Sequence, residues 1–450
     1  MKFIKLFVML GFVLSSLFSY ATTILPSSQV SQINVRSELS SPIIMAGSEE
    51  TNYLKVSLTG EKANSNKHVP INLALVIDKS GSMQGDRIVK AREAAIFAVN
   101  MLNEEDTLSI VTYDYDAKVI VPATKVKNKE QIIKLINKNL VAGGGTALFA
   151  GLSKGIKQVE SQLTKDKVNR IILLSDGQAN IGPSSVAELS QLAIIAAKKN
   201  IAITTMGIGS DYNEILMSSI ASYSDGNHVF VNNTFDLEKM FVHEFTDVMS
   251  TVAQNVVITI QLKDGVKPVR LLGRDGVIKG NQVTIKMNQL FSNQEKYVLL
   301  EVIPEEGKVG QSKTLAQIDL SYDNLLRNKA EHETQFVSVA YTDDKKLVKD
   351  SMIQEVLAES EIQKVTIENE KALEYHNLGR FQEAEDILME NSKKLSSISN
   401  SVSSEEAKER LRGQIEKNNI MADAAKADKD VFNKISAEKQ FESKSNVIKK

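Results

Sequence analysis

The pattern of apolar and polar residues predicts an α/β block over residues 69–249. Short apolar runs, typical of strands buried on both faces, lie at 71–77, 107–113, 117–121, 168–174, 201–206 and 229–231. Between them, apolar residues recur three or four positions apart, which is typical of helices. This order predicts a doubly wound, mostly parallel sheet covered by helices. One edge pair is expected to be antiparallel, because only Asp114–Asp116 separates its two strands.

On both sides of this block, apolar and polar residues alternate as they do in half-buried strands. Two such runs (32–39 and 53–59) precede it, in a segment bounded at 22–68. Six more follow within 250–345, at 256–262, 269–272, 282–287, 297–303, 315–320 and 335–341. Since two strands do not form a stable sheet alone, we expect the early pair to join the later six in one β-sandwich. The α/β block would then be inserted in that sandwich.

From residue 346 the pattern becomes helical. Apolar positions predict helices over 349–378, 381–395 and 405–420. Leu378–Ala384 resembles the turn and second helix of a tetratricopeptide-type unit, and because an array needs about three units, we expect a C-terminal α-helical hairpin region over 346–421. Residues 422–450 are rich in Lys, Glu and Ala, which predicts a charged, solvated tail.

The first 21 residues predict export. Lys2 and Lys5 precede an apolar stretch, Leu6–Phe18, and cleavage is expected after Ala21. The stretch is shorter than the ~20 residues of a spanning helix, which favours a cleaved signal peptide over the alternative, an uncleaved anchor. No later segment has a transmembrane pattern. The chain contains no cysteine, which suits a bacterial periplasmic or secreted protein. Its net charge of −2 gives no general attraction to nucleic acid.

Three segments at predicted strand or helix ends carry oxygen-bearing side chains. They are Asp78-x-Ser80-x-Ser82 after the first buried strand, Thr146 after three glycines, and Asp176 after the strand 168–174. The carboxyl ends of parallel strands share one edge, where open α/β sheets bind ligands. Oxygen ligands without His or Cys favour Mg²⁺, Mn²⁺ or Ca²⁺. The alternative is that Asp78, Ser80 and Ser82 only cap the next helix.

These five positions match a known pattern. The block resembles a von Willebrand factor type A (vWA) domain with a metal-ion-dependent adhesion site, and the flanking strands resemble bacterial relatives of the inter-α-trypsin inhibitor heavy chains. The resemblance implies that the hydroxyls of Ser80, Ser82 and Thr146 bind the metal directly or through water. It implies that Asp78 and Asp176 act partly through water.

Three functions are considered for this site. A cation held by only two carboxylates would accept an Asp or Glu of a protein or peptide partner, which predicts a non-enzymatic, cation-dependent binding or adhesion protein of the cell envelope. An alternative is an envelope scaffold whose helical region is the main interaction surface. A metal-dependent hydrolase would need a general base, and no His, Lys or Cys pattern supplies one.

Overall fold

The computed structural model describes residues 32–62, 68–176, 179–209, 212–231 and 237–427, and the short stretches 431–432, 435–436, 438–439 and 448–449. The predicted signal peptide therefore lies outside the described residues. Among the helices that are described, none is both long and apolar enough to cross a bilayer.

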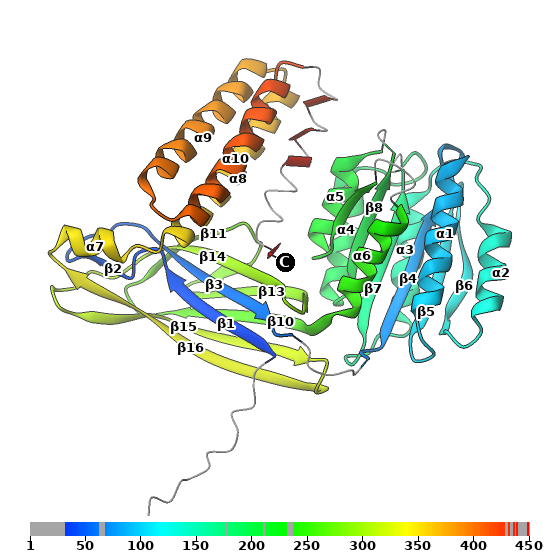
Figure 1. The fold of residues 1–450 in the computed structure, drawn as a ribbon, viewed down its shortest axis with the longest axis horizontal. Helices are drawn as coiled ribbons and strands as arrows, with labels where there is room; N and C mark the ends of the chain where they lie inside the picture. The colour runs from blue at the N-terminus through cyan, green and yellow to red at the C-terminus, as the bar shows by residue number, and fades with distance from the viewer. Residues whose placement is uncertain are drawn as a thin grey trace, which may run out of the picture. The chain divides into compact units, whose positions relative to one another are not determined.

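The α/β block contains a six-stranded sheet with helices on both faces (Figure 1). The strand order is β6-β5-β4-β7-β8-β9, and β5 with β6 is the antiparallel pair. The prediction of a mostly parallel α/β sheet is thus confirmed. The strands are β4 (Ile71–Asp78), β5 (Thr107–Tyr113), β6 (Ala117–Lys125), β7 (Val168–Ser175), β8 (Ala202–Ile208) and β9 (His228–Val231). The helices are α1 (Asp86–Met101), α2 (Lys129–Asn139), α3 (Leu148–Glu160), α4 (Val186–Lys198), α5 (Glu214–Tyr223) and α6 (Leu237–Met249).

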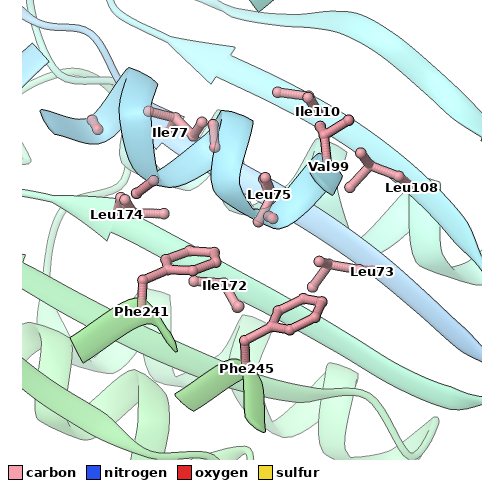
Figure 2. Close-up of a cluster of buried hydrophobic side chains, with 14 of the residues drawn as sticks. Leu73, Leu75, Ile77, Val99, Leu108, Ile110, Ile172, Leu174, Phe241 and Phe245 are labelled. Atoms are coloured by element: carbon pink, nitrogen blue, oxygen red, sulfur yellow. The ribbon is translucent and has the colours of Figure 1, made fainter. Parts of the chain in front are cut away.

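Successive side chains of β4 enter two different cores, because strand residues alternate between faces. Leu73, Leu75 and Ile77 pack with α1, α2 and α6, and Figure 2 shows them beside Phe241 and Phe245 of α6. The neighbouring β4 residues, Ala74 and Val76, face the core formed with α3, α4 and α5. All of β4 is buried, so its last residue, Asp78, is held at a fixed position on the sheet edge.

The other strands form two further sheets that share one hydrophobic core. The first has the order β1-β3-β14-β11, and β17 (Ile448–Lys449) also pairs with β14. The second has the order β12-β13-β10-β15-β16-β2. The strands of the first are β1 (Ile33–Leu39), β3 (Asn52–Gly60), β11 (Lys267–Leu272) and β14 (Glu295–Ile303). The strands of the second are β2 (Ile43–Met45), β10 (Thr251–Leu262), β12 (Val277–Lys279), β13 (Gln282–Phe291), β15 (Ser312–Asn324) and β16 (Lys329–Thr342).

Three long helices follow a short one. They are α8 (Gln354–Asn377), α9 (Phe381–Ser401) and α10 (Glu405–Ala424), preceded by α7 (Lys345–Ser351). The helix predicted over 349–378 is interrupted near its start, because Met352 and Ile353 are extended, and α8 accounts for the rest of it as far as Asn377. The amide of Ile353 donates to Ser40 O at 2.9 Å, so a tertiary hydrogen bond replaces a helical one.

Two details of the C-terminal region differ from the expectation. A hairpin would account for α8 and α9, whereas α10 packs on both of them as a third helix. The region after residue 422 was expected to be solvated, but Phe432 is fully buried in a cluster with residues of α8, α9 and α10. Its ring stacks on His376 with the centroids 3.9 Å apart.

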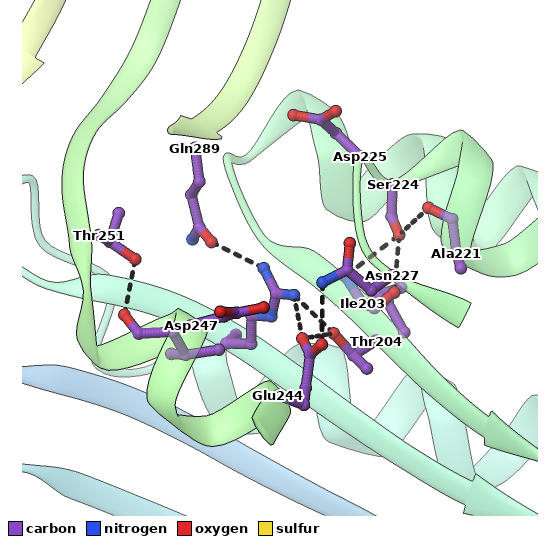
Figure 3. A network of polar contacts seen from close by, with 12 residues as sticks. Ile203, Thr204, Ala221, Ser224, Asp225, Asn227, Glu244, Asp247, Thr251 and Gln289 are labelled. Carbon is purple, nitrogen blue, oxygen red and sulfur yellow. Dashed lines mark hydrogen bonds and ion pairs between the residues drawn. The ribbon is translucent and has the colours of Figure 1, made fainter. Parts of the chain in front are cut away.

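Buried polar contacts join the amino edge of the α/β sheet to α6 and β13. Arg170 of β7 donates to Gln289 (2.8 Å) and to Thr204 (2.6 Å), and it forms an ion pair with Glu244. Figure 3 shows Glu244 of α6 in this network, where it also accepts from Asn227 at 2.8 Å. The chain enters the block at the start of β4 and leaves it at the end of α6. Both connections therefore lie at the amino edge.

Candidate functional site

The turn after β4 gathers one carboxylate and two hydroxyls. Asp78 is fully buried; its Oδ1 accepts from the Ser80 amide (2.8 Å), and its Oδ2 accepts from the Ser175 hydroxyl (2.7 Å). A single 3₁₀ turn, η1 (Gly81–Met83), then places the Ser80 and Ser82 hydroxyl oxygens 3.0 Å apart. Helix α1 has Gly85 at its N-cap, without a side-chain hydrogen bond. The capping interpretation of this pentad therefore finds no support in the described contacts.

Backbone hydrogen bonds bring the glycine loop before Thr146 against this turn. The Gly81 amide donates to Gly144 O (2.9 Å), and the Gly143 amide donates to Lys79 O (2.8 Å). Gly144 has a φ of 93°, which a glycine adopts without strain. Thr146 itself is buried, and its amide donates to the Asn180 side chain at 2.8 Å.

Asp176 completes the group from the neighbouring strand. It directly follows Ser175, whose hydroxyl donates to Asp78. That contact forms because β4 and β7 are adjacent and parallel, so their carboxyl ends lie side by side. The carboxylate is 1% exposed. Its Oδ2 lies 3.4 Å from Nη1 of Arg87, and its Oδ1 is buried without a hydrogen-bond partner among the described residues. The structure thus brings the loops of all five predicted residues to one edge of the sheet.

A bound cation would balance the electrostatics of this group. Burial raises the pKa of Asp78 to about 6, and the nearby charge of Asp176 adds to the rise. A buried carboxylate oxygen without a donor is costly unless something neutralises it. The described residues contain no group of three or more His, Cys, Asp or Glu side chains arranged for a metal. Two carboxylates with neighbouring hydroxyls fit a hard, oxygen-preferring cation such as Mg²⁺.

Sequence reasoning missed three residues of this site. Ser175 and Asn180 orient Asp78 and Thr146 by the hydrogen bonds given above. Arg87 lies between Asp176 and Ser82, whose backbone oxygen is 3.3 Å from its Nη1. The only signal for Ser175 was its place in the polar turn with Asp176. Arg87 and Asn180 had none, since a charged or amide residue near a helix start has many ordinary roles.

Comparison with known proteins identifies the family of the α/β block. A family model of the von Willebrand factor type A domain matches residues 72–244. The chain is 26% identical over 281 residues to an uncharacterized protein of Synechocystis sp., a match that covers 60% of this chain and 66% of that protein. It is 29% identical over 167 residues to inter-alpha-trypsin inhibitor heavy chain H3 of Mus musculus, covering 35% of this chain and 19% of that protein. The match thus spans less than two thirds of either relative.

The fold extends the likeness beyond the matched segment. A solved von Willebrand factor type A protein from Catenulispora acidiphila superposes with a TM-score of 0.62 at 16% identity, over 82% of this chain and 89% of that one. The strand order, the site loops at the carboxyl edge and the family model agree. Residues 72–244 are therefore a von Willebrand factor type A domain.

Proposed function

We propose that this domain binds a divalent cation and, through it, an acidic side chain of a protein partner. Proteins with von Willebrand factor type A domains generally mediate protein interactions and adhesion. The finer assignment rests on the site of this chain. Asp78, Ser80, Ser82, Thr146 and Asp176 would hold the ion, either directly or through water.

The single observation that carries the proposal is that Oδ1 of Asp176 has no hydrogen-bond partner among the residues that the structure describes. This atom is buried, it belongs to a residue that is 1% exposed, and it lies beside the Asp78 turn. Nearly all buried polar atoms in folded proteins have a partner, so an exception at a sheet edge lined with oxygen atoms favours an ion as the missing one. When bound, the cation would supply a positive centre with exchangeable positions.

The composition of the site favours Mg²⁺, with Mn²⁺ and Ca²⁺ as alternatives. Mg²⁺ is usually held by one or two carboxylates and keeps several waters, one of which a ligand oxygen can replace. We propose binding rather than catalysis, because the side chains placed here are carboxylates, hydroxyls and Arg87. Metal-assisted hydrolysis would in addition need a positioned general base.

The setting of the domain completes the proposal. We infer that the two remaining sheets, which are antiparallel except for the β2–β16 pair, act as one β-sandwich into which the domain is inserted, since they share a core formed from strands before and after it. We also infer export to the periplasm or cell surface, from the signal-like pattern of residues 1–21 and the lack of cysteine.

The test is a titration of the full chain with Mn²⁺ and with Mg²⁺ by calorimetry. We expect one site per chain, with affinity reduced at least about tenfold in Asp176→Asn because a charged ligand is lost. Asp86→Asn is the matched control, since Asp86 is an exposed carboxylate in the first turn of α1. Absence of binding to the unaltered chain, or equal affinities in the two variants, would refute the proposal.

The partner side is tested separately. Proteins captured from envelope extract by the immobilised full chain in Mg²⁺ should be released by EDTA. They should not be captured by Asp176→Asn. Capture that survives both treatments would instead support the scaffold alternative.

A further inference from the structure

We propose that Tyr115 is a specificity-determining residue, which stacks on an aromatic side chain next to the partner's Asp or Glu. This inference rests on the proposed function, because it places a second contact at the rim of the same cation site. It deepens that function by naming the class of partner more closely. The ligand would be a protein segment in which an acidic residue is preceded or followed by an aromatic one.

The first argument is that the ring lies against a loop of the site. A Cβ at Gly144 would lie 2.9 Å from Cδ2 of Tyr115, so the ring packs on the backbone of the glycine loop. The carbonyl of this glycine accepts from the amide of Gly81, which lies between Ser80 and Ser82, at 2.9 Å. A single residue therefore separates the ring from the turn that carries the two hydroxyls, and Tyr115 lies at the rim of the oxygen cluster.

The second argument is that the turn between β5 and β6, which carries the ring, is held in place. The Asp114 carbonyl accepts from the Ala147 amide at 2.7 Å, and the Asp114 carboxylate forms an ion pair with Lys79. On the other side of the ring, the Asp116 carboxylate accepts from the Ala117 amide at 2.7 Å. These contacts fix the turn against both neighbouring loops of the site. Little conformational freedom would therefore be lost when a ligand contacts the ring.

The third argument is the exposure of apolar side chains at this rim. Tyr115 is 70% exposed, and Val141, in the loop before Gly143, is 63% exposed. The Gly143 amide donates to Lys79 O at 2.8 Å, so this loop also lies against the Asp78 turn. A single exposed apolar residue is common on a protein surface, but two at one rim indicate a contact surface. The part of the partner that meets this rim is therefore expected to be apolar.

The chemistry of a tyrosine ring defines the matching group. A bound cation attracts every carboxylate, so it does not by itself distinguish one acidic segment from another. An aromatic ring beside the ion adds a preference for a second aromatic ring, and such a pair strengthens binding by about three- to tenfold. This contact uses the ring and not its hydroxyl, so phenylalanine should replace Tyr115 without loss.

The experiment uses the full chain loaded with Mn²⁺ and pairs of probes of increasing length. Each pair consists of a straight-chain carboxylate and the same acid with a terminal phenyl group: acetate with phenylacetate, propionate with 3-phenylpropionate, and butyrate with 4-phenylbutyrate. Enhanced relaxation of the probe protons by bound Mn²⁺ yields each affinity, and calorimetry measures the affinity for Mn²⁺ itself. The different lengths allow the phenyl group to reach the ring from the ion.

The variants are Tyr115→Ala, Tyr115→Phe and, as a control, Tyr223→Ala. Tyr223 is also an exposed tyrosine (47%), and it is the last residue of α5. Since α5 leads to the start of β9, which runs parallel to β8, Tyr223 lies at the amino edge of the sheet, opposite the site. The control therefore removes an exposed tyrosine ring from the same domain at a distance from the site.

For at least one length, we expect the phenyl acid to bind the unaltered chain about three- to tenfold more tightly than the matching acid without the phenyl group. This gain in affinity should vanish in Tyr115→Ala and persist in Tyr115→Phe and Tyr223→Ala. The straight-chain acids and Mn²⁺ should bind equally to all four chains.

A gain that is absent at every length, or that survives in Tyr115→Ala, overturns the proposal and leaves the metal site standing. Loss of the gain in Tyr115→Phe or Tyr223→Ala also overturns it, because the effect would then not belong to the Tyr115 ring. Weaker binding of Mn²⁺ or of the straight-chain acids by Tyr115→Ala has the same consequence, because Tyr115 would then only support the glycine loop. Failure of the unaltered chain to bind Mn²⁺ would refute the proposed function itself.

Discussion

The ion pair between Arg170 and Glu244 yields a quantitative prediction about stability. The two side chains are 1% and 3% exposed, so solvent screening is weak. Glu244 also accepts hydrogen bonds from Thr204 (2.5 Å) and Asn227 (2.8 Å). Replacing Glu244 with glutamine keeps the size of the side chain but leaves the guanidinium of Arg170 buried without its counter-charge.

The expected cost follows from this geometry. Removing one partner of a buried pair typically costs about 3–5 kcal/mol, because the other charge stays desolvated. The amide of the introduced glutamine would still offer one acceptor oxygen, so we expect Glu244→Gln to lower the free energy of unfolding by about 3 kcal/mol. A double variant, Arg170→Met with Glu244→Leu, should lose much less than Glu244→Gln, since it removes both charges together.

The assay is urea unfolding followed by far-UV circular dichroism, because the chain has no tryptophan to report by fluorescence. A chain with several sheets need not unfold in two states. Hydrogen exchange of the α6 and β7 amides therefore provides a local measure of the same loss.

The matched control is Glu238→Gln, an exposed position in the first turn of α6, where the change should stay within about 0.5 kcal/mol. If Glu244→Gln and Glu238→Gln were equally stable, the reasoning from burial would be refuted. The same conclusion would follow if the double variant were less stable than Glu244→Gln, because burial of an unpaired charge could not then explain the loss.

Two further predictions concern pH and packing. Burial alone would raise the pKa of Asp225, but Lys296 and Arg274 hold it below its usual range. Its contribution is therefore present above the unfolded pKa of ~3.9 and is lost as the pH falls below that value. Asp225→Asn should lower the free energy of unfolding in urea by about 3 kcal/mol at pH 7, because it leaves Lys296 buried and unpaired. The difference in stability from the unaltered chain should shrink below about pH 4, and a pH-independent difference would contradict this reasoning. In α3, a Cβ at Gly155 would lie 2.4 Å from a Val76 methyl. Gly155→Ala should therefore lower the free energy of unfolding, measured by heat or urea, by about 1–3 kcal/mol, although alanine has the better helix propensity. A Cβ at Gly413 in α10 would contact no neighbouring atom of the described residues within 4 Å, and Gly413→Ala should therefore raise the free energy of unfolding by about 0.5–1 kcal/mol. Higher stability in both alanine variants would argue against the packing contact at Gly155.

Local patterns were sufficient for most elements and for the main site loop. The strands predicted at 71–77, 107–113 and 168–174 match β4, β5 and β7 to within one residue, because polar turn residues bound each short apolar run. Asp78, Ser80 and Ser82 could be grouped because they follow a buried strand within five residues. Thr146 and Asp176 needed the additional rule that parallel strands end on one edge.

Contacts between distant residues could not be predicted in this way. Arg170 lies in an apolar strand, and its partner Glu244 is 74 residues away, so no local signal joins the two. The break between α7 and α8 depends on Ser40, far earlier in the chain, which accepts from Ile353. Phe432 was assigned to a solvated tail from composition, but one aromatic residue suffices to pack on His376.

The two connections of the α/β block at one edge of its sheet have a mechanical consequence. β4 is eight residues long, so the oxygen cluster at the opposite edge lies about 25 Å from them. A partner that pulled on a bound cation would stretch the block along its strands. The hydrogen bonds from β4 to β5 and β7 would then resist together, in shear, instead of opening one after another, which would suit the proposed cation-dependent binding of a partner that pulls on the ion.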